Sequence, residues 1–98
     1  MIRVLDEEME IVLNIIKKHT KKCEVLVFGS RLKEDNRKFS DLDLAFICKG
    51  GLGLKKRIKL DIEFEESDLP YKVDVIDYNT TSKEFQKIID NNNEKIYG

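Results

Sequence analysis

The sequence predicts a small α/β (α+β) domain with its elements in the order α-β-β-α-β-α, built on a mixed sheet of about three strands. Stretches with helical spacing of apolar residues alternate with short β-branched runs, as in sheets packed with helices. The 98 residues are 41% hydrophobic, and 18 Lys and Arg balance 19 Asp and Glu. One compact domain accounts for this length, so we expect residues 1–98 to form a single domain.

The charge balance and the cysteines exclude several classes of protein. A net charge of −1 argues against a broad basic surface for nucleic acid. No stretch approaches the roughly 18 apolar residues of a membrane span, so we expect a cytoplasmic protein without a membrane partner. Cys23 and Cys48 belong to no Cys-x-x-Cys pair, which predicts neither a disulfide framework nor a zinc site but packing of both thiols in the core.

The first elements are a helix, a strand and a loop. A helix is expected over about residues 5–20, where apolar residues recur at spacings of three and four and acidic residues precede basic ones. Residues 24–28 are apolar and β-branched and stop at Gly29, which predicts a buried strand. Residues 31–40 are dominated by charge and predict a short helical turn followed by a surface loop.

A second strand and a second helix follow. Residues 41–48 predict a strand inside the sheet, and the glycines of residues 49–53 indicate a strand-to-helix turn. Pro70 ends the helical region, since proline cannot continue a helix. The helix is expected through about residue 66, marked by apolar residues spaced by four: Leu54, Ile58 and Ile62.

The last elements are a strand and a helix. Residues 71–78 are rich in β-branched residues and predict a third strand. A capping box over residues 81–84 opens the final helix. Asparagines at residues 91–93 mark its frayed end. The residues expected to face inward from this helix are Phe85, Ile88 and Ile89.

A pair of carboxylates carries the first chemical signal. Asp41 and Asp43 stand two apart on a strand, so both side chains leave one face with Cα atoms roughly 6.5 to 7 Å apart. Like charges in this position need a cation, and Mg²⁺ sits between carboxylates and substrate phosphates. The same residues also match a helix start with Ser40 as the N-cap. That alternative is weakened because residues 44–48 show no helical period.

A phosphate-binding turn precedes this pair. Gly29 and Ser30 follow the first strand and offer a bare backbone position, a hydroxyl and amides that accept phosphate oxygens. Taken alone, a Gly-Ser pair usually only turns the chain. Its weight comes from the carboxylate pair that follows ten residues later.

These motifs resemble the minimal nucleotidyltransferases of the DNA polymerase beta superfamily. The matching segments are Phe28-Gly29-Ser30-Arg31 and Ser40-Asp41-Leu42-Asp43-Leu44. The resemblance implies a third carboxylate on a later strand, and Asp74 between two valines supplies it. Asp77 is the second choice, because an offset of three places it on the opposite face of the strand.

The resemblance also implies an activity. The family fold would use Mg²⁺, with two ions, held by Asp41, Asp43 and Asp74, while Gly29, Ser30 and Arg31 would bind the phosphates of ATP. AMP would then pass to a hydroxyl of a HEPN-domain toxin, which makes this chain an antitoxin. The alternative for Arg31 is that it is a solvated surface residue of the charged loop and does not contact the triphosphate.

Two other functions stay open at this point. In one, the domain would neutralise its toxin by occlusion without turnover. In the other, it would nucleotidylate a small antibiotic, but a chain this short has no room for the accessory domain that this activity would need. The sequence leaves the base preference, the acceptor and homo-oligomer formation open.

Overall fold

The computed structural model describes residues 2, 4–29 and 41–98. The predicted α/β class is confirmed, but the described sheet has four strands instead of about three. The elements in chain order are α1 (Asp6–His19), β1 (Cys23–Phe28), β2 (Leu42–Cys48), α2 (Leu54–Glu66), β3 (Val73–Asp77), the 3-10 helix η2 (Tyr78–Thr80), α3 (Lys83–Asn91) and β4 (Asn93–Tyr97).

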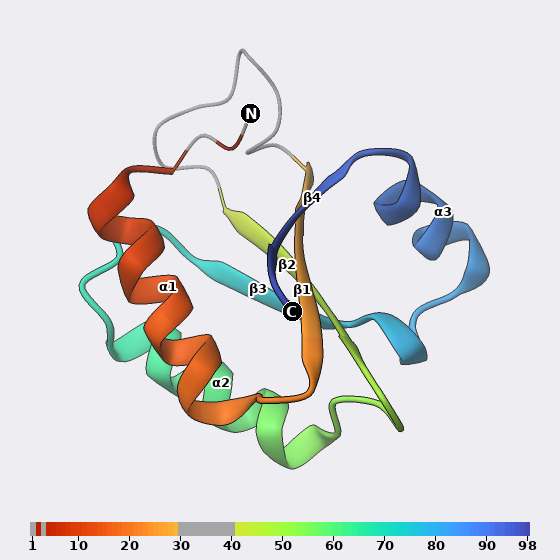
Figure 1. Cartoon of the computed structure of the whole chain (residues 1–98), viewed down its shortest axis with the longest axis horizontal. Helices are drawn as coiled ribbons and strands as arrows, with labels where there is room; N and C mark the ends of the chain where they lie inside the picture. The colour runs from red at the N-terminus through yellow and green to blue at the C-terminus, as the bar shows by residue number, and fades with distance from the viewer. Residues whose placement is uncertain (1, 3, 30–40) are drawn as a thin grey trace.

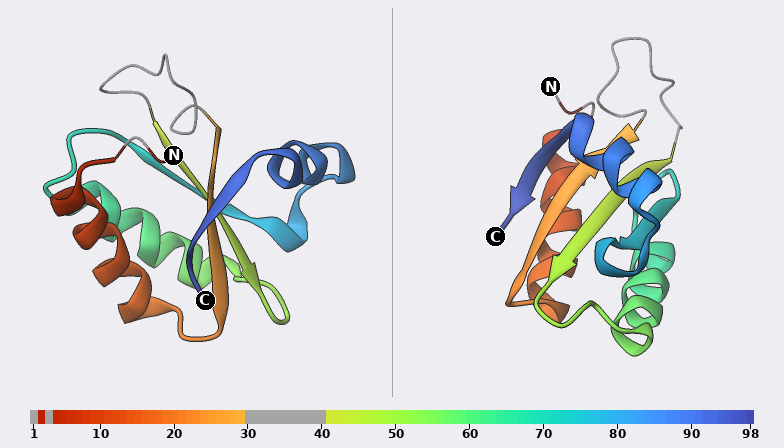
Figure 2. Two further views of the ribbon diagram at one scale, coloured as in Figure 1. Left: turned by 45° about the horizontal axis from the view of Figure 1, so that its top comes forward. Right: turned by 90° about the vertical axis from the view of Figure 1, so that its right-hand side faces the viewer.

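The sheet has the order β3-β2-β1-β4 and mixes both pairing directions. β1 pairs antiparallel with β2 and with β4, whereas β2 and β3 are parallel. The parallel pair is joined by α2, as a crossover connection requires. α1 and α2 cover one face of the sheet and α3 lies on the other (Figures 1 and 2).

Strand alternation divides the core into two layers. One face of β1 and β2 packs under α1 and α2 with residues that include Val25, Val27, Leu44 and Phe46. The opposite face carries a smaller cluster against α3, made of Leu26, Phe28, Ala45 and Ile89. Side chains two apart on a strand therefore share a layer, and this rule also positions the polar residues of the sheet.

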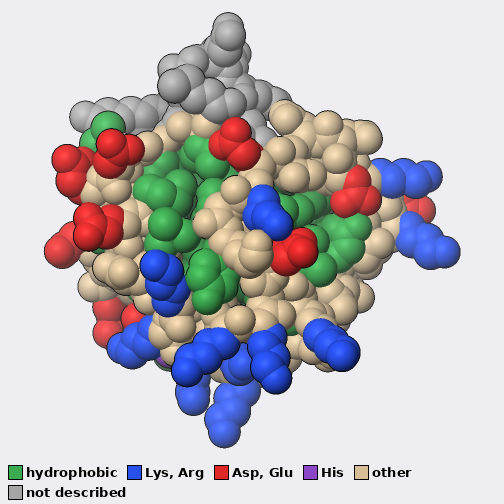
Figure 3. Space-filling view, viewed as in Figure 1, with side chains coloured by type: hydrophobic (Ala, Val, Ile, Leu, Met, Phe, Trp, Pro, Cys, Tyr) green, Lys and Arg blue, Asp and Glu red, His purple; other side chains and the backbone are tan. Residues whose placement is uncertain are grey.

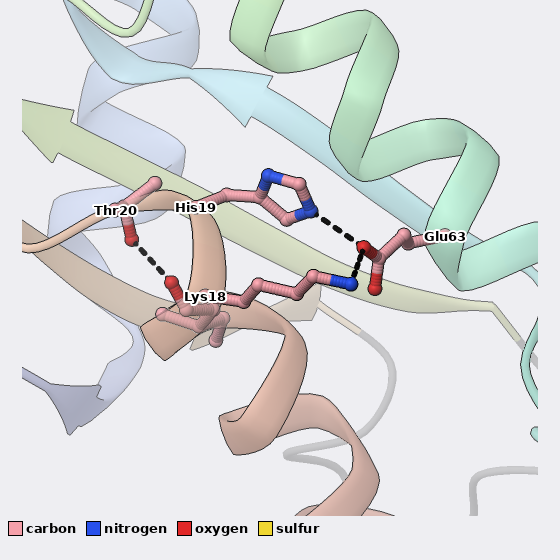
Figure 4. Close-up of polar contacts among 5 residues, drawn as sticks. Lys18, His19, Thr20 and Glu63 are labelled. Carbon is pink, nitrogen blue, oxygen red and sulfur yellow. Dashed lines mark hydrogen bonds and ion pairs between the residues drawn. The ribbon is translucent and has the colours of Figure 1, made fainter.

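A polar contact joins the two helices of the larger layer. The Glu63 carboxylate on α2 lies 2.8 Å from His19 Nε2 and 2.8 Å from Lys18 Nζ at the end of α1 (Figure 4). These two partners lower the pKa of the Glu63 carboxyl through hydrogen bonds and charge. Thr20 closes α1, because its hydroxyl donates to the Ile16 carbonyl at 2.9 Å.

The end of the chain differs from expectation. The helix α3 ends at Asn91, within the asparagines predicted to mark its end, but the chain then continues into β4, which was not predicted and which pairs with β1. β4 is an exposed edge strand, and only Ile96 and Tyr97 pack against the core, so its sequence lacks the apolar signal of a buried strand. The N-cap of α3 is Ser82, whose hydroxyl accepts from the Phe85 amide at 3.2 Å.

One prediction about a buried side chain is wrong, and it concerns Ile88 on α3. On α2 the residues that marked the helix, Leu54, Ile58 and Ile62, lie outside, and the helix buries Leu60 and Phe64. Ile88 is 58% exposed, because α3 turns only Ile89 and part of Phe85 toward the sheet. Both faces of α2 carry apolar residues, and a pattern on one chain does not tell which of them meets the sheet.

The cysteines were also predicted wrongly, as unpaired packing residues. Cys23 and Cys48 are both buried, but they form a disulfide. The physical reason is register, because the antiparallel pairing of β1 and β2 places the two residues directly opposite each other. Their separation in the sequence gives no sign of this.

Lysines gather at the end of the sheet where this disulfide lies (Figure 3). They surround a cavity of about 350 Å³ together with His19. Within the described residues, five lysines therefore lie at this end of the sheet, and Asp43 lies at the opposite end of β2. The lysines around this cavity are Lys18, Lys21, Lys22, Lys49 and Lys56.

Asp77 has a structural position at the end of β3. Its carboxylate accepts from the Leu52 amide at 3.2 Å and from the Asn79 amide at 3.2 Å. It thereby ties the glycine turn before α2 to the start of η2. The aspartate is 9% exposed, so these amides replace the water it has lost.

Replacing Asp77 is expected to cost stability. Asp77→Ala leaves a buried Leu52 amide without its acceptor, and the loss is about 3 kcal/mol for two charge-assisted bonds. Urea unfolding followed by circular dichroism measures this loss. Asp68→Ala, an exposed position in the connection before β3, is the control and is expected to stay within about 0.5 kcal/mol. Equal values for the two variants would contradict the structural role.

Candidate active site

Two aspartates meet across the parallel pair of strands. Asp43 on β2 is in register with Asp74 on β3. Both alternate with residues buried beneath α1 and α2, so both side chains leave the face of the sheet that α3 shares. The sequence predicted Asp43 and Asp74 as partners, and the structure brings them into hydrogen-bond contact.

This contact changes the acidity of one member. The pKa of the Asp43 carboxyl is raised from 3.8 to about 6. Partial burial is the largest cause, and the Asp74 charge, the hydrogen bond to Asp74 and the Asp41 charge follow. Asp43 is therefore held ready to accept a proton or a cation near neutral pH.

Asp41 lies just before β2, on the same side as Asp43 but exposed. Its charge reaches Asp43, yet in residues 2, 4–29 and 41–98 no three metal-binding side chains gather into a complete site. A cation between Asp43 and Asp74 would therefore need further oxygen ligands. Carboxylates together with phosphate oxygens and water form the set that Mg²⁺ prefers. The donor chemistry fits magnesium.

Gly29, directly after β1, lies against the Asp43 carboxylate. It follows Phe28, which is in register with Asp43, and its φ is +82°. A Cβ added at Gly29 would overlap Oδ2 of Asp43. Both the backbone conformation and the closeness of Asp43 thus require glycine at this position.

Lys72 is a site residue that the sequence analysis missed. Its Nζ lies 3.4 Å from Asp74 Oδ1, and the side chains are 73% and 34% exposed. Lys72 stands directly before β3 and precedes Asp74 by two residues, so the period-two rule applied to the predicted strand over residues 71–78 would have found it. The ammonium compensates part of the negative charge at the edge of the site.

The remaining predicted residues are placed as follows. Ser30 and Arg31 lie outside the described residues. Asp77 points to the opposite side of β3, where it binds backbone amides, so it does not join Asp43 and Asp74. The preference for Asp74 over Asp77 agrees with this geometry.

A comparison with protein families identifies the fold. The family described as "Polymerase beta, Nucleotidyltransferase" matches residues 10–98. The chain belongs to this family. The resemblance inferred from the Gly-Ser and Asp-x-Asp motifs is thereby confirmed.

Known proteins are similar to this chain over almost its whole length. A "Probable protein adenylyltransferase MntA" of Haemophilus influenzae is 43% identical over 94 residues, which cover 96% of this chain and 79% of that protein. The crystal structure of a toxin–antitoxin with AMP-PNP matches 96% of this chain and 74% of its own, with a TM-score of 0.79 and 20% identity. A tri-AMPylated HEPN toxin in complex with MNT antitoxin from Shewanella oneidensis matches 92% and 69%, with a TM-score of 0.70 and 19% identity. At these identities the two structures show the fold alone.

Replacement of Gly29 is expected to damage both stability and the site. Gly29→Ala is expected to cost more than about 2 kcal/mol, because a positive φ costs about 1 to 2 kcal/mol and the new methyl group displaces Asp43 as well. Gly53→Ala is the matched control, since Gly53 has a φ of +85° with nothing within 4 Å of an added Cβ. Urea unfolding compares the two variants. A Gly29→Ala loss no larger than that of Gly53→Ala would contradict the contact with Asp43.

The raised pKa of Asp43 predicts a pH dependence in protein freed of metal with EDTA. The folded state binds the Asp43 proton more tightly than the unfolded chain between pH 3.8 and about 6. The stabilisation is complete below pH 3.8 and is lost as the pH rises through about 6. Asp43→Asn has no carboxyl proton to lose at this position. Its Tm is therefore expected to increase relative to that of the wild type as the pH rises from 3.8 to about 6.

Thermal unfolding at several pH values measures this difference. Asp68→Asn serves as the control and is expected to follow the wild type at every pH. Parallel curves for wild type and Asp43→Asn would show that Asp43 titrates normally.

Proposed function

We propose that this chain is a protein adenylyltransferase that transfers AMP from ATP to a hydroxyl of a HEPN-domain toxin and acts as its antitoxin. The Haemophilus influenzae relative, at 43% identity, is a probable protein adenylyltransferase. Of two structures with the same fold, one is a toxin–antitoxin with AMP-PNP, and the other is a tri-AMPylated HEPN toxin in complex with its MNT antitoxin. These relatives support ATP as the nucleotide and a protein as the acceptor.

The observation that carries the proposal is the contact between Asp43 and Asp74. Two carboxylates in register, one with its pKa raised to about 6, form a repulsive pair that a divalent cation would relieve. A domain that acted only by occlusion would gain nothing from this arrangement. The pair is therefore better explained by phosphoryl transfer than by binding alone.

The proposal gives each site residue a role. Asp41, Asp43 and Asp74 would hold Mg²⁺, as a pair of ions, and Gly29, Ser30 and Arg31 would bind the outer phosphates. When bound, the metal neutralises charge on the α-phosphate and on the leaving pyrophosphate. Gly29 has no side chain, so phosphate oxygens can approach its backbone closely, and the Asp43 carboxylate lies directly beside it.

The reaction forms one bond and breaks another at the α-phosphorus. The acceptor oxygen bonds to phosphorus, and the bond to the oxygen that bridges to the β-phosphate breaks, releasing pyrophosphate. Asp74 orients the acceptor hydroxyl and takes its proton, and Lys72 holds the Asp74 carboxylate in place. The attacking and leaving oxygens lie on opposite sides of the phosphorus.

We place this reaction in the cytoplasm, where ATP is made and used. None of the helices in the described ranges has the length and apolar character that a bilayer crossing requires. Cytoplasmic thiols reduce most disulfides, so we propose that the working protein carries Cys23 and Cys48 as thiols. Both lie in the core layer beneath α1 and α2, away from Asp43 and Asp74. Activity is therefore independent of their oxidation.

The test follows label from α-³²P-ATP into the HEPN toxin in the presence of Mg²⁺. Wild type is expected to label the toxin. Asp43→Asn and Asp74→Asn are each expected to lower the rate at least about 100-fold, because each removes a carboxylate that would hold Mg²⁺ against the phosphates. Asp68→Asn leaves both Asp43 and Asp74 unchanged and is expected to label the toxin at the wild-type rate.

Neutralisation of the toxin in growing cells separates the two functions. The enzyme hypothesis predicts that Asp43→Asn fails to protect cells from the toxin. Full protection by this variant, with no label transferred by wild type, would establish occlusion instead.

A further inference from the structure

A groove runs along the outer edge of β3, beside the candidate active site. β3 is the last strand of the sheet on this side. Between this strand and α2 lies a cavity of about 490 Å³. Its strand wall is formed by residues 72–76 and so includes Asp74. The α2 wall consists of Arg57, Asp61, Phe64 and Glu65.

The strand wall offers unused backbone groups. The Lys72 carbonyl accepts from the Leu42 amide of β2 at 2.9 Å. In a strand, the amide and carbonyl of one residue point to one side and those of the next residue point to the other side. The backbone groups of Asp74 therefore face β2, as those of Lys72 do, and the backbone groups of Val73 and Val75 face outward. Within the described part of the chain, no strand pairs with β3 on that side. An open edge of this kind is a template for another extended chain.

We propose that this groove binds an extended segment of the acceptor protein as a fifth strand, antiparallel to β3, and that the residue opposite Asp74 carries the hydroxyl that receives AMP. The inference rests on the proposed adenylyltransferase function and adds to it how the acceptor is recognised. Main-chain hydrogen bonds to Val73 and Val75 supply the alignment of the segment.

Sheet geometry places the hydroxyl where the reaction needs it. Val73 and Val75 would form hydrogen-bonded pairs with the new strand, so Asp74 would face its neighbour in a non-hydrogen-bonded pair with Cα atoms about 4.5 Å apart. Opposite residues share a face of the sheet. The hydroxyl would therefore stand on the same face as Asp74 and Asp43.

The two substrates would then approach the carboxylates from opposite sides. Gly29 lies at the end of β1, on one side of Asp43, and the open edge of β3 lies on the other side of Asp74. Phosphates at Gly29 and a hydroxyl at the edge would flank the α-phosphorus. An in-line displacement requires this arrangement.

The α2 wall would recognise the neighbours of the reacting residue. Side chains before and after it would turn to the other face of the sheet, into the groove beside α2. There they would meet one buried aromatic ring, Phe64, and charges of both signs, Arg57 and Glu65. Burial raises the pKa of the Asp61 carboxyl, the Arg57 charge opposes this rise, and the Asp74 charge adds to it. The groove wall is thus electrically coupled to the site.

Other occupants fit less well. A second copy pairing through its own β3 would bring a second Asp74 to a site that already repels negative charge. A nucleoside would fill the volume but has no repeating donors and acceptors to match Val73 and Val75. Both alternatives become outcomes of the experiment.

The test measures amide hydrogen exchange of ¹⁵N-labelled protein by NMR, alone, with AMP-PNP and with saturating HEPN toxin. Toxin is expected to slow exchange at Val73 and Val75 at least tenfold. Asp74 and Ile76 are expected to change little, because their amides already face β2. No slowing at the edge with toxin, or the same slowing with AMP-PNP or at high concentration of the protein alone, would overturn the inference.

A pair of double variants tests the groove wall in the labelling assay. Arg57→Ala/Glu65→Ala is expected to raise KM for the toxin at least tenfold. The rate at which ATP is hydrolysed to AMP and pyrophosphate without the toxin is expected to stay unchanged. The control Lys59→Ala/Glu66→Ala alters the same helix on its outward side and is expected to leave KM unchanged. An equal KM for both pairs would overturn the docking surface.

The two proposals can fail separately. Transfer by wild type without edge protection would leave the adenylyltransferase in place and remove the fifth strand. Edge protection by toxin with no transfer of label would support docking and remove the enzyme.

Discussion

The repulsion between Asp43 and Asp74 is the constraint around which the rest of the site is arranged. Parallel pairing of β2 and β3 brings the two carboxylates together, and neither strand can relieve the repulsion without losing its register. The surroundings accommodate this pair at both flanks. On one side, the absence of a side chain at Gly29 leaves space for the Asp43 carboxylate, and on the other side Lys72 places a positive charge next to Asp74. The fold thus holds a local electrostatic cost that only a proton, a cation or a neighbouring ammonium reduces.

Much of this arrangement was predictable, because strands alternate with a period of two. That rule put Asp43 and Asp74 on one face and Asp77 on the other, and it would also have given Lys72. What it could not give is the alignment of separate strands. The disulfide depends on which residue of β1 lies opposite Cys48, and no pattern within either strand specifies that pairing.

Errors arose where apolar residues did not decide burial. β4 is exposed over Asn93–Lys95 and has no apolar run, so its pairing with β1 is maintained mainly by backbone bonds that leave no mark in the sequence. The helix α2 is apolar at Leu60 and Phe64 but also on its outer face, as at Ile58. A helix with two apolar stripes fits the sheet in two orientations, and only tertiary packing chooses between them. The groove beside β3 likewise exists only once the crossover has closed.

β3 carries two carboxylates with unrelated duties on its two faces. Asp74 serves the polar face, and Asp77 anchors the turns behind the sheet. Insertion of one residue between them would rotate one of these groups to the wrong side, and deletion would do the same. A change of length between Asp74 and Asp77 would therefore misplace either the candidate active site or the anchor of the turns, so the five residues of β3 have a fixed spacing.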